Sequence, residues 1–366
     1  KTSFLVSPLS MYWFSLFLLS RVLKSFSIAV TLSNSSFAIL QLKWFHQFQF
    51  AGYYAAKEKG FYDEVGLNVE IRQRDLKYNN IDEVINGNAQ YGVADSILIL
   101  YRLKQQPVVI VSPIFQHSPS VFISLKKSNI SSVYELNKKD ILFYPNDTDG
   151  FSLLAMIKKF DLDVNLVRER YKDDYMRLIN NEVDVMPAYI ANEPFLFKEK
   201  GYDVNIINPT NYGFDMYGDM LFTNEDEAKN NPIRVEKFKE ATLKGWKYAL
   251  ENKEEIIQLI NEKYSKEKSI EHLRYEANAI DSLINKDVTP LGYLDQGRIR
   301  YISEMYEYYG LTESKIDLND FLFDEISKKD KKLSLSDEEI KYLKDNPILK
   351  VHNLDSFPPY NFTINN

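Results

Sequence analysis

The chain has 366 residues, with 45 Lys and Arg against 52 Asp and Glu, and it contains no cysteine. A net charge of −7 argues against a general nucleic-acid-binding protein, which needs a basic face. The lack of cysteine excludes disulfides, thiolate metal sites, iron–sulfur clusters and thiol catalysis. The four histidines lie far apart in the sequence, so neither a metal site nor a cofactor is predicted.

The first residues have the pattern of a secretory leader. Arg21 and Lys24 give a short basic region, an uncharged run follows over 25–32, and small residues precede Ala38. We therefore predict a signal peptide over 1–38, cleaved after Ala38, and a protein outside the cytoplasm. The alternative is a leader without a role. The apolar run is too short and too interrupted to span a bilayer stably.

Beyond the leader, short apolar strands alternate with helices, and the first helix ends at Gly60, a natural C-cap. Strands are expected at 39–44, 69–72, 91–93, 108–112 and 121–125, and helices at 51–59, 81–85 and 97–104. Alternation at this spacing is typical of βαβ units and a mainly parallel sheet.

The alternation then begins afresh and is followed by long amphipathic helices. Strands are expected at 141–144, 164–167, 183–186 and 204–207, helices between them at 151–160, 174–180 and 193–200, and long helices at 233–264, 271–284 and 297–309. Two α/β units in series predict two lobes with a cleft between them. The long helices are expected to pack back on the first lobe.

The last part of the chain has a different character. Residues 313–334 are charged and lack a sustained apolar period, so we predict a linker there. Ser336 and Glu339 form a capping box that opens a new helix, and a strand and a proline-rich turn follow. The segment 335–366 is too short to bury a core of its own. We expect it to be the truncated start of a second domain in a longer protein.

Aromatic and polar residues between strands and helices are candidates for ligand binding, because ligands of open parallel sheets lie at the carboxyl ends of strands. Trp44, His46 and Tyr53 offer stacking faces and hydrogen-bond donors, or else form a packed hydrophobic loop. Asp95 can accept a hydrogen bond from a ligand. Ser96 either helps it or caps the next helix.

The second half of the chain offers a further set of candidates. Asn146 lies in an acidic strand-to-helix loop that suits a polar uncharged ligand better than an anion. Tyr189, Asn192 and Glu193 lie around the start of a helix, where a carboxylate is stabilised by the helix dipole. Glu193 therefore either caps this helix or points into the cleft to accept from an amino or ring N–H group.

The return crossing between the lobes holds the last candidates. Gly213 and Gly218 suit a hinge, and Asp219 lies next to them. His117, on the first crossing, is either a ligand donor or a structural hydrogen-bonding residue. The sequence contains no phosphate-binding glycine loop, no nucleophile elbow and no His and carboxylate pair at metal spacing, so no catalytic residues are predicted.

At these motifs the chain resembles a known family. Residues from about 39 to 310 resemble the periplasmic solute-binding proteins related to thiamine-pyrimidine precursor binding and synthesis. The motifs are LKW at 42–44, FAGYYAAKEKGFY at 50–62, YGVADS at 91–96, ANEP at 191–194 and YGD at 217–219. The resemblance implies a two-lobed α/β fold of the type II periplasmic-binding-protein kind (a Venus flytrap) with C-terminal helices, and a pyrimidine-like ligand.

The segment 335–366 is similar to the opening of amino-acid-type solute-binding domains, through EIKYL at 339–343 and FPPY at 357–360. This order of domains resembles the extracytoplasmic part of bacterial membrane sensors, whose output is usually a histidine kinase or a diguanylate cyclase. We therefore expect a sensor that is tethered to the inner membrane through modules missing from this sequence. Such a full-length receptor could act as a dimer.

Three alternatives stay open. One is a purely structural tandem domain whose cleft binds nothing. A second is the solute-binding component of an ABC transporter. The third is a thiamine pyrimidine synthase, since the family also contains such a single-turnover enzyme, which consumes pyridoxal phosphate and a histidine of its own chain and carries a cysteine-rich iron motif. This chain has no cysteine, and the place of the donor histidine is near Ile97. The fragment itself is therefore predicted not to be an enzyme.

The predicted solute-binding domain covers residues 39–312. The first lobe is expected to comprise about 39–125 and 220–310, and the second about 126–219. A small molecule would contact both lobes only when they close.

Overall fold

The computed structural model describes residues 36–143, 151–167, 174–313, 315–318, 320–330, 345, 356–357 and 361–362. The described residues up to Ile326 form one compact unit, and those from Ser327 onward form a second. The second unit contains the short antiparallel pair β11 (Ser356–Phe357) and β12 (Asn361–Phe362). Most of the predicted second domain, 335–366, lies outside the described residues, so that prediction stays a prediction.

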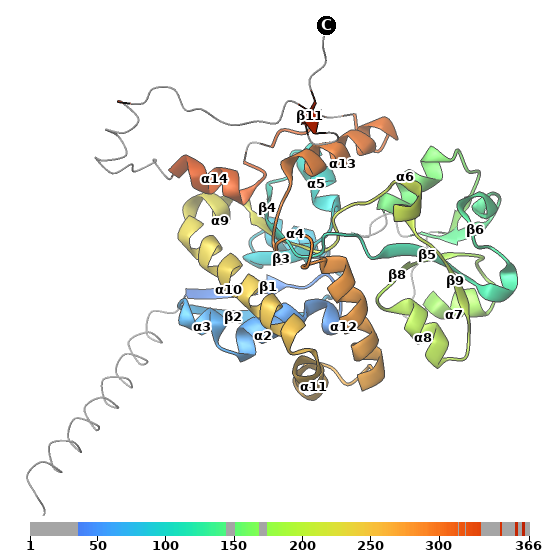
Figure 1. Ribbon diagram of the computed structural model, residues 1–366, viewed down its shortest axis with the longest axis horizontal. Helices are drawn as coiled ribbons and strands as arrows, with labels where there is room; N and C mark the ends of the chain where they lie inside the picture. Colours follow the sequence, from blue (N-terminus) through green and yellow to red (C-terminus); the bar gives the residue numbers. More distant parts are fainter. Residues whose placement is uncertain are drawn as a thin grey trace, which may run out of the picture. The chain divides into compact units, whose positions relative to one another are not determined.

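The first lobe is built on a five-stranded sheet in the order β2-β1-β3-β10-β4 (Figure 1). Its strands are β1 (Ser36–Gln41), β2 (Leu67–Arg72), β3 (Tyr91–Ala94), β4 (Val108–Pro113) and β10 (Met220–Asn224). Strand β1 is parallel to β2 and β3, whereas β10 runs antiparallel to both of its neighbours. Because β10 comes from the return crossing, the first lobe is completed only after the chain has built the second.

The second lobe repeats this plan. Its strands are β5 (Ser120–Leu125), β6 (Asp140–Leu142), β7 (Asn165–Val167), β8 (Met186–Tyr189) and β9 (Val204–Ile207). Strand β5 pairs antiparallel with β8 and β9, and β6 pairs parallel with β7. A parallel bridge between Ile141 and Val185 joins the two pieces into the order β7-β6-β8-β5-β9. In both lobes the fourth strand of the sheet is thus the antiparallel one.

Helices cover the sheets of both lobes (Figure 1). The first lobe carries η1 (Phe48–Phe50), α2 (Ala51–Glu58), α3 (Phe61–Glu64), α4 (Asn80–Ile85) and α5 (Ile97–Leu103). The second carries η2 (Lys126–Ser128), η3 (Val133–Leu136), α6 (Phe151–Lys159), α7 (Asp174–Ile179), α8 (Glu193–Glu199) and η4 (Pro209–Tyr212). After β10 follow α9 (Glu225–Asn230), α10 (Pro232–Glu251), α11 (Lys253–Lys263), α12 (Ile270–Ile284), α13 (Gln296–Tyr308) and α14 (Phe323–Asp330).

The C-terminal helices pack on the first lobe, as predicted. Helix α10 buries Val235, Phe238 and Trp246 on one face, at the spacing of an amphipathic helix. A Cβ at Gly245 would overlap the carbonyl oxygen of Gly52, so α10 and α2 approach each other closely through two glycines. One apolar cluster of this lobe lies between these helices and the sheet, and a second includes residues of α4, α5 and α13.

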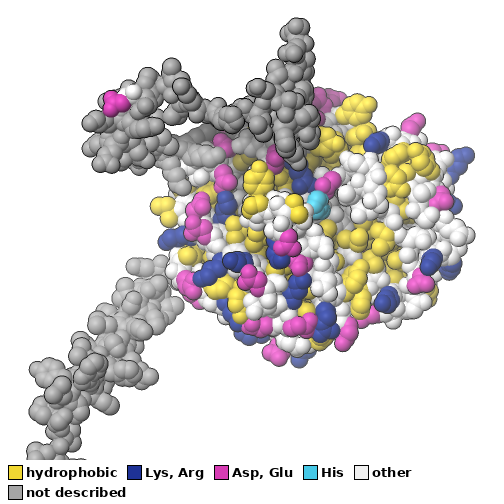
Figure 2. All heavy atoms as spheres, viewed as in Figure 1, with side chains coloured by type: hydrophobic (Ala, Val, Ile, Leu, Met, Phe, Trp, Pro, Cys, Tyr) yellow, Lys and Arg dark blue, Asp and Glu magenta, His cyan; other side chains and the backbone are white. Residues whose placement is uncertain are grey.

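Acidic and basic side chains are interspersed on the face of the first lobe that Figure 2 shows around α10 and α11. Several form ion pairs between helices, such as Arg274 with Glu254 and Lys263 with Glu58. Pairs this exposed contribute little to stability, about 0–1 kcal/mol each. They keep the charged surface mixed rather than concentrated in one sign.

Two segments connect the lobes and are hydrogen-bonded to each other. The backbone N–H groups of Ile114 and Phe115 donate to the carbonyl oxygen of Asp219 at 2.8 and 3.0 Å. Gly218 N–H donates back to Phe115 at 3.1 Å, and a Cβ at Gly218 would lie 2.7 Å from the carbonyl oxygen of His117. The crossings therefore form a narrow paired ribbon, the place where a hinge between the lobes belongs.

One predicted boundary requires correction. The first lobe was expected to extend to residue 125, but β5 pairs with β8 and β9, so the division falls before Ser120. Cleavage after Ala38 would remove half of β1, whose Ser36 pairs with Leu67 in the sheet. Ser36 and Phe37 lie in β1 in this structure, and cleavage after Ala38 stays a prediction.

Two further elements differ from the prediction. The long helix expected over 233–264 is divided at Asn252 into α10 and α11, since the Asn252 backbone leaves the helical conformation. The linker expected over 313–334 does not begin at 313. Phe321 is buried, its carbonyl oxygen accepts from Ile110 N–H at 2.8 Å, and Leu322 forms a bridge with the same residue. A few well-placed apolar residues therefore outweigh the charged composition of this segment.

Candidate functional site

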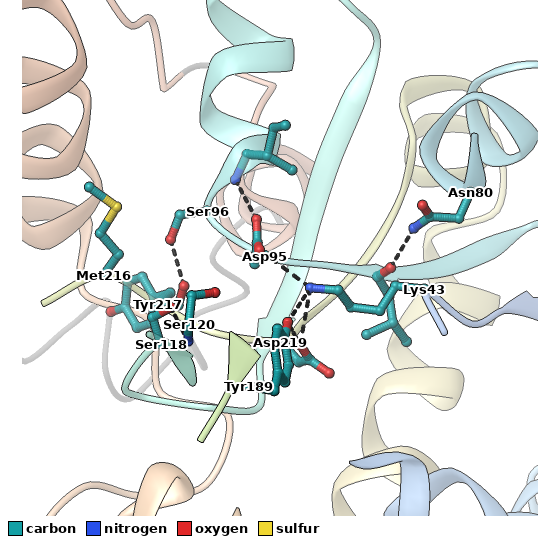
Figure 3. A network of polar contacts seen from close by, with 12 residues as sticks. Lys43, Asn80, Asp95, Ser96, Ser118, Ser120, Tyr189, Met216, Tyr217 and Asp219 are labelled. Atoms are coloured by element: carbon teal, nitrogen blue, oxygen red, sulfur yellow. Dashed lines mark hydrogen bonds and ion pairs between the residues drawn. The ribbon is translucent and has the colours of Figure 1, made fainter. Parts of the chain in front are cut away.

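A buried lysine lies at the centre of a polar network between the lobes (Figure 3). Lys43 Nζ lies 3.3 Å from Asp95 Oδ2 and 3.4 Å from Asp219 Oδ1, and it donates to the Tyr189 hydroxyl at 2.6 Å. The Lys43 side chain is only 1% exposed. Since Lys43 belongs to the first lobe and Tyr189 to the second, the network connects the two.

The topology explains why these residues meet. Lys43 follows β1 and Asp95 follows β3, and the carboxyl ends of neighbouring parallel strands share one edge of the sheet. Asp219 precedes β10, which runs antiparallel, so its start lies at the same edge. Tyr189 ends β8 of the second lobe. Four residues far apart in sequence are thereby brought to the crossing point of the two lobes.

Hydrogen bonds hold both carboxylates in place. Asp219 Oδ2 accepts from Gln49 Nε2 at 2.7 Å, and Asp95 Oδ1 accepts from the backbone N–H of Ile97 at 2.9 Å. Buried charges are stable only when they are paired and hydrogen-bonded, and this network meets both conditions. The network therefore presents two carboxylates and one amine at the junction of the lobes.

A second cluster, the Lys268 cluster, lies beside the first. Lys268 Nζ is hydrogen-bonded to Glu276, to Gln47 and, at 2.7 Å, to Asn192 Oδ1 in the second lobe. Glu276 is 1% exposed and also accepts from the backbone N–H of Phe48 at 2.9 Å. Burial raises the pKa of Glu276, whereas the ammonium of Lys268 opposes this rise.

The two clusters share the wall of a small cavity between the lobes. Its volume is about 10 Å³, room for about one water molecule. Polar groups on the wall alternate with an apolar face, and the lining residues are Gln47, Gln49, Phe115, Tyr189, Ala191, Asn192, Glu276 and Ile280. Amides, a phenol and a carboxylate thus surround an apolar face at the junction of the lobes.

Glu193, by contrast, forms its side-chain hydrogen bonds with neighbouring residues of the second lobe. Its two carboxylate oxygens accept from the backbone N–H of Tyr189 at 2.6 Å and from Asn192 Nδ2 at 2.7 Å. Burial raises its pKa, and these hydrogen bonds oppose the rise. Of the two predicted roles, the structure places Glu193 at the start of α8, where it fixes the turn that carries Asn192.

Three aromatic candidates lie between β1 and the first turn of α2. Burial first, and the nearby carboxylate of Asp219 second, raise the pKa of Tyr53. Trp44 is half-buried and packs edge-on against Phe45. His46 Nδ1 is hydrogen-bonded to the Tyr54 hydroxyl at 2.9 Å, and burial lowers its pKa. Tyr53 is 1% exposed and lies edge-on to Trp246 in the core. His46 and Tyr53 therefore belong to the packing of the first lobe.

The remaining candidates occupy other positions. Ser96 does not cap α5 with its side chain, and its hydroxyl donates instead to the carbonyl oxygen of Tyr217 at 2.6 Å. His117 Nδ1 lies 2.9 Å from Asp215 Oδ1, which places it in the crossing ribbon rather than in the network. Asn146 lies outside the described residues.

Sequence reasoning missed four residues of the site: Lys43, Gln49, Lys268 and Glu276. Lys43 could have been recognised as a candidate from the sequence, since a charged residue directly after an apolar strand is unusual in an α/β core. Gln49 carried a weaker one, as a polar residue between Phe48 and Phe50. Lys268 and Glu276 lie in a charged helical region where nothing in the pattern distinguishes them from surface residues.

Within the described ranges, no group of three or more His, Cys, Asp or Glu side chains is placed to hold a metal ion. None of the helices there combines the length and apolar composition needed to cross a membrane.

Two lobes of the same strand order, joined by two crossings and meeting at a polar cleft, define the class of two-lobed periplasmic-binding-protein folds. Residues 47–256 match the family described as NMT1/THI5 like, and the chain belongs to that family. Solved structures of low sequence identity share the fold. The sulfonate-binding protein SsuA from Methylobacillus flagellatus has 17% identity and a TM-score of 0.59, covering 82% of this chain and 96% of that one.

The nitrate-binding protein NrtA from Synechocystis has 13% identity and a TM-score of 0.61, and the match covers 84% of this chain and 91% of that one.

Two curated relatives are closer in sequence. The riboflavin-binding protein RibY of Chloroflexus aurantiacus is 27% identical over 232 residues, which cover 60% of this chain and 64% of that protein. The formylaminopyrimidine-binding protein of Halalkalibacterium halodurans is 23% identical over 226 residues, covering 60% and 68%. The chain thus matches slightly under two thirds of the length of the first relative.

Proposed function

We propose that this chain binds a small nitrogen heterocycle, a pyrimidine or a ring system that contains one, in the cleft between its lobes, outside the cytoplasmic membrane. The observation that carries the proposal is the network of Lys43, Asp95, Tyr189 and Asp219, which unites both lobes at the carboxyl edge of the first sheet. The names of the two relatives support it, because riboflavin and formylaminopyrimidine are both nitrogen heterocycles.

The chemistry of the cleft fits such a ligand. Asp95 and Asp219 can accept hydrogen bonds from ring N–H and amino groups, and the amides of Gln47, Gln49 and Asn192 can both donate and accept. The ammonium of Lys43 can donate to a ring nitrogen or a carbonyl oxygen. Phe115 and Ile280 on the cavity wall provide an apolar surface for the ring faces.

Binding would favour the closed arrangement of the lobes. A ligand that contacts the first lobe through Asp219 and the second through Tyr189 makes both contacts only when the lobes are together. Its effect on the hinge equals the difference between its affinities for the closed and open forms. The ribbon of the two crossings is narrow enough to take up this movement.

The purpose that binding serves in the cell is a separate matter. The sensor role rests on residues 335–366, most of which lie outside the described residues, so it stays a prediction beside the transporter alternative. The synthase alternative is disfavoured by the absence of cysteine and by Ile97 at the place of the donor histidine. The names of both curated relatives, which describe binding proteins, favour binding over catalysis.

Thermal unfolding of the full chain with riboflavin, the formylaminopyrimidine, thiamine and a set of amino acids tests the proposal. A ligand that binds only the folded state stabilises it by about 2.7 kcal/mol at a hundredfold excess over its Kd. We expect the unfolding midpoint to rise with at least one heterocycle and not with amino acids. A well-folded sample that responds to no heterocycle would refute the proposal.

Matched variants locate the binding site. Asp219→Asn and Tyr189→Phe remove one polar group each from the network and should abolish most of the shift. Asp281→Asn is the control, because it removes the carboxylate of an ion pair with Lys253 that lies within the first lobe. A ligand shift that survives both network variants would place binding elsewhere.

A further inference from the structure

Lys268 lies on the loop between α11 and α12, and three groups surround its ammonium. Glu276 and Gln47 come from the first lobe, and Asn192 comes from the second. Glu276 is 1% exposed, and its other oxygen is held by the backbone N–H of Phe48. The ammonium is thus fixed by its own lobe before it reaches across the cleft.

Hydrogen bonds hold the Asn192 side chain in place as they hold the Lys268 ammonium. Its Oδ1 accepts from Lys268, while its Nδ2 donates to Glu193 Oε1 at 2.7 Å. Glu193 in turn accepts from the backbone N–H of Tyr189, the residue whose hydroxyl accepts from Lys43. A chain of hydrogen bonds therefore connects Lys268 to the lysine network through the second lobe.

Three other contacts join the region around α8 in the second lobe to the region around α12. Ser269 Oγ donates to Glu199 at 2.7 Å, Tyr275 donates to the carbonyl oxygen of Ile190 at 2.9 Å, and the ring of Phe195 lies 4.9 Å from that of His272. All of them join one lobe to the other. Lys268 differs because it is the cation among them and because its position is set by a buried carboxylate.

We propose that Lys268 is a closure latch, a positioning residue that stabilises the closed form by donating to Asn192 and thereby raises ligand affinity without contacting the ligand. The inference rests on the proposed binding function for its effect on affinity, although its effect on closure is independent of any ligand. A hydrogen bond between a charged donor and a neutral acceptor is stronger than a neutral pair, and here it forms only when the lobes are closed.

The test compares Lys268→Met with Lys253→Met. Lys253 is the matched control, since it is similarly half-buried, lies at the start of α11 and pairs with Asp281 inside the first lobe. The double variant Lys268→Met with Glu276→Gln removes the buried carboxylate that the single variant would leave unpaired. Lys268→Arg should restore the latch, because it retains a charged donor.

Closure is measured without ligand from the distance between two spin labels. The chain has no cysteine, so labels on Lys127→Cys in the second lobe and Lys237→Cys in the first react uniquely. We expect Lys268→Met, alone and with Glu276→Gln, to lower the share of the short distance, and Lys253→Met and Lys268→Arg to leave it unchanged. An equal share in Lys268→Met and the parent protein would overturn the latch.

Affinity is measured by calorimetric titration with riboflavin and the formylaminopyrimidine. We expect Lys268→Met to raise Kd about tenfold, the factor that corresponds to about 1.4 kcal/mol, mainly through faster dissociation. An unchanged Kd in a variant that binds would also overturn the proposal. If neither compound binds the parent protein, the proposed function fails, and the label distances alone decide for or against the latch.

Discussion

At the scale of single residues, Lys43 is the cation on which the buried carboxylates Asp95 and Asp219 depend. Lys43→Met removes a cation that lies within 3.4 Å of a carboxylate oxygen of each, and breaking a buried ion pair from one side costs about 3–5 kcal/mol. We expect a loss of that size in the unfolding free energy, measured by urea denaturation. Lys253→Met should cost less, because the Lys253–Asp281 pair remains partly in contact with solvent.

The double variant Lys43→Met with Asp219→Asn tests whether the loss comes from repulsion between the carboxylates. Removing one carboxylate relieves part of the repulsion, so the double variant should be more stable than Lys43→Met alone. Equal or additive losses would contradict the view that Lys43 neutralises the network.

His272 provides a prediction about pH. Burial first, and the charge of Lys268 second, lower its pKa to about 4 from a usual value near 6.5, while Glu199 opposes the shift. The unfolded chain therefore binds more protons than the folded one between these values, and stability falls as the pH is lowered from about 6.5 to about 4. Above pH 6.5 the contribution is fully present.

His272→Gln removes this titration. Urea denaturation at pH 7, 6, 5 and 4.5 should show a smaller loss of unfolding free energy in the variant than in the parent protein. Glu276, Glu199 and Lys268, the charged groups near the ring, are the same in both proteins, so the comparison isolates the imidazole. Parallel curves would show that His272 does not titrate in this range.

Single-residue roles were the least predictable part from sequence. Asp95 was proposed because it follows a strand, and Asp219 because it lies on the return crossing; the structure brings both to Lys43, and their contact with a ligand stays a prediction. His46 and Tyr53 pack inside the first lobe, where Tyr53 interacts with Asp219, and a role of either in ligand binding stays a prediction. Lys268 and Glu276 could not be found, because charged residues are frequent around the start of α12 and nothing in their pattern marks these two as a buried pair.

At the scale of elements, the contact of α2 with α10 is set by glycine. Gly245→Ala would bring a Cβ within 2.7 Å of Ala56 Cβ and into the carbonyl oxygen of Gly52. Forcing these helices apart should cost about 1–3 kcal/mol, as overpacking does in other cores. The free energy of unfolding in urea measures it.

Gly297→Ala in α13 is the control for this change. There the nearest atom to the added Cβ is Asp295 Oδ1 at 3.0 Å, the oxygen that caps α13 by accepting from the backbone N–H of Arg298, so only this cap has to adjust and no backbone atom is in the way. We expect an effect below about 1 kcal/mol, the typical contribution of an N-cap. If both variants lose the same stability, the cost would come from helix geometry in general and not from the α2–α10 contact.

Most elements were predictable from alternating apolar segments and from caps such as Gly60. The wrong predictions concern the ends of elements and the connections between them. The uniform composition of residues 233–264 did not indicate that the helix divides at Asn252. Phe321 and Leu322 pair with Ile110 of the first lobe, a contact that no local sequence pattern predicts. Tertiary contacts decide such boundaries.

At the scale of the whole molecule, the two lobes have the same strand order although they are completed in different ways. In the first lobe the antiparallel strand is β10, which arrives last, and in the second it is β5, which arrives first. The two-lobed arrangement could be predicted from two series of βαβ units. The exact division before Ser120 could not, since β5 reads as a continuation of the first series until its partners are known.

The most direct measurement of the central claim is the distance between the labels at positions 127 and 237 during titration with riboflavin and the formylaminopyrimidine. The account predicts that one of these heterocycles increases the share of the short distance until it saturates, and that Asp219→Asn requires far more ligand for the same change. A distance distribution that neither compound alters, in a folded protein, would contradict a heterocycle-binding cleft that closes on its ligand.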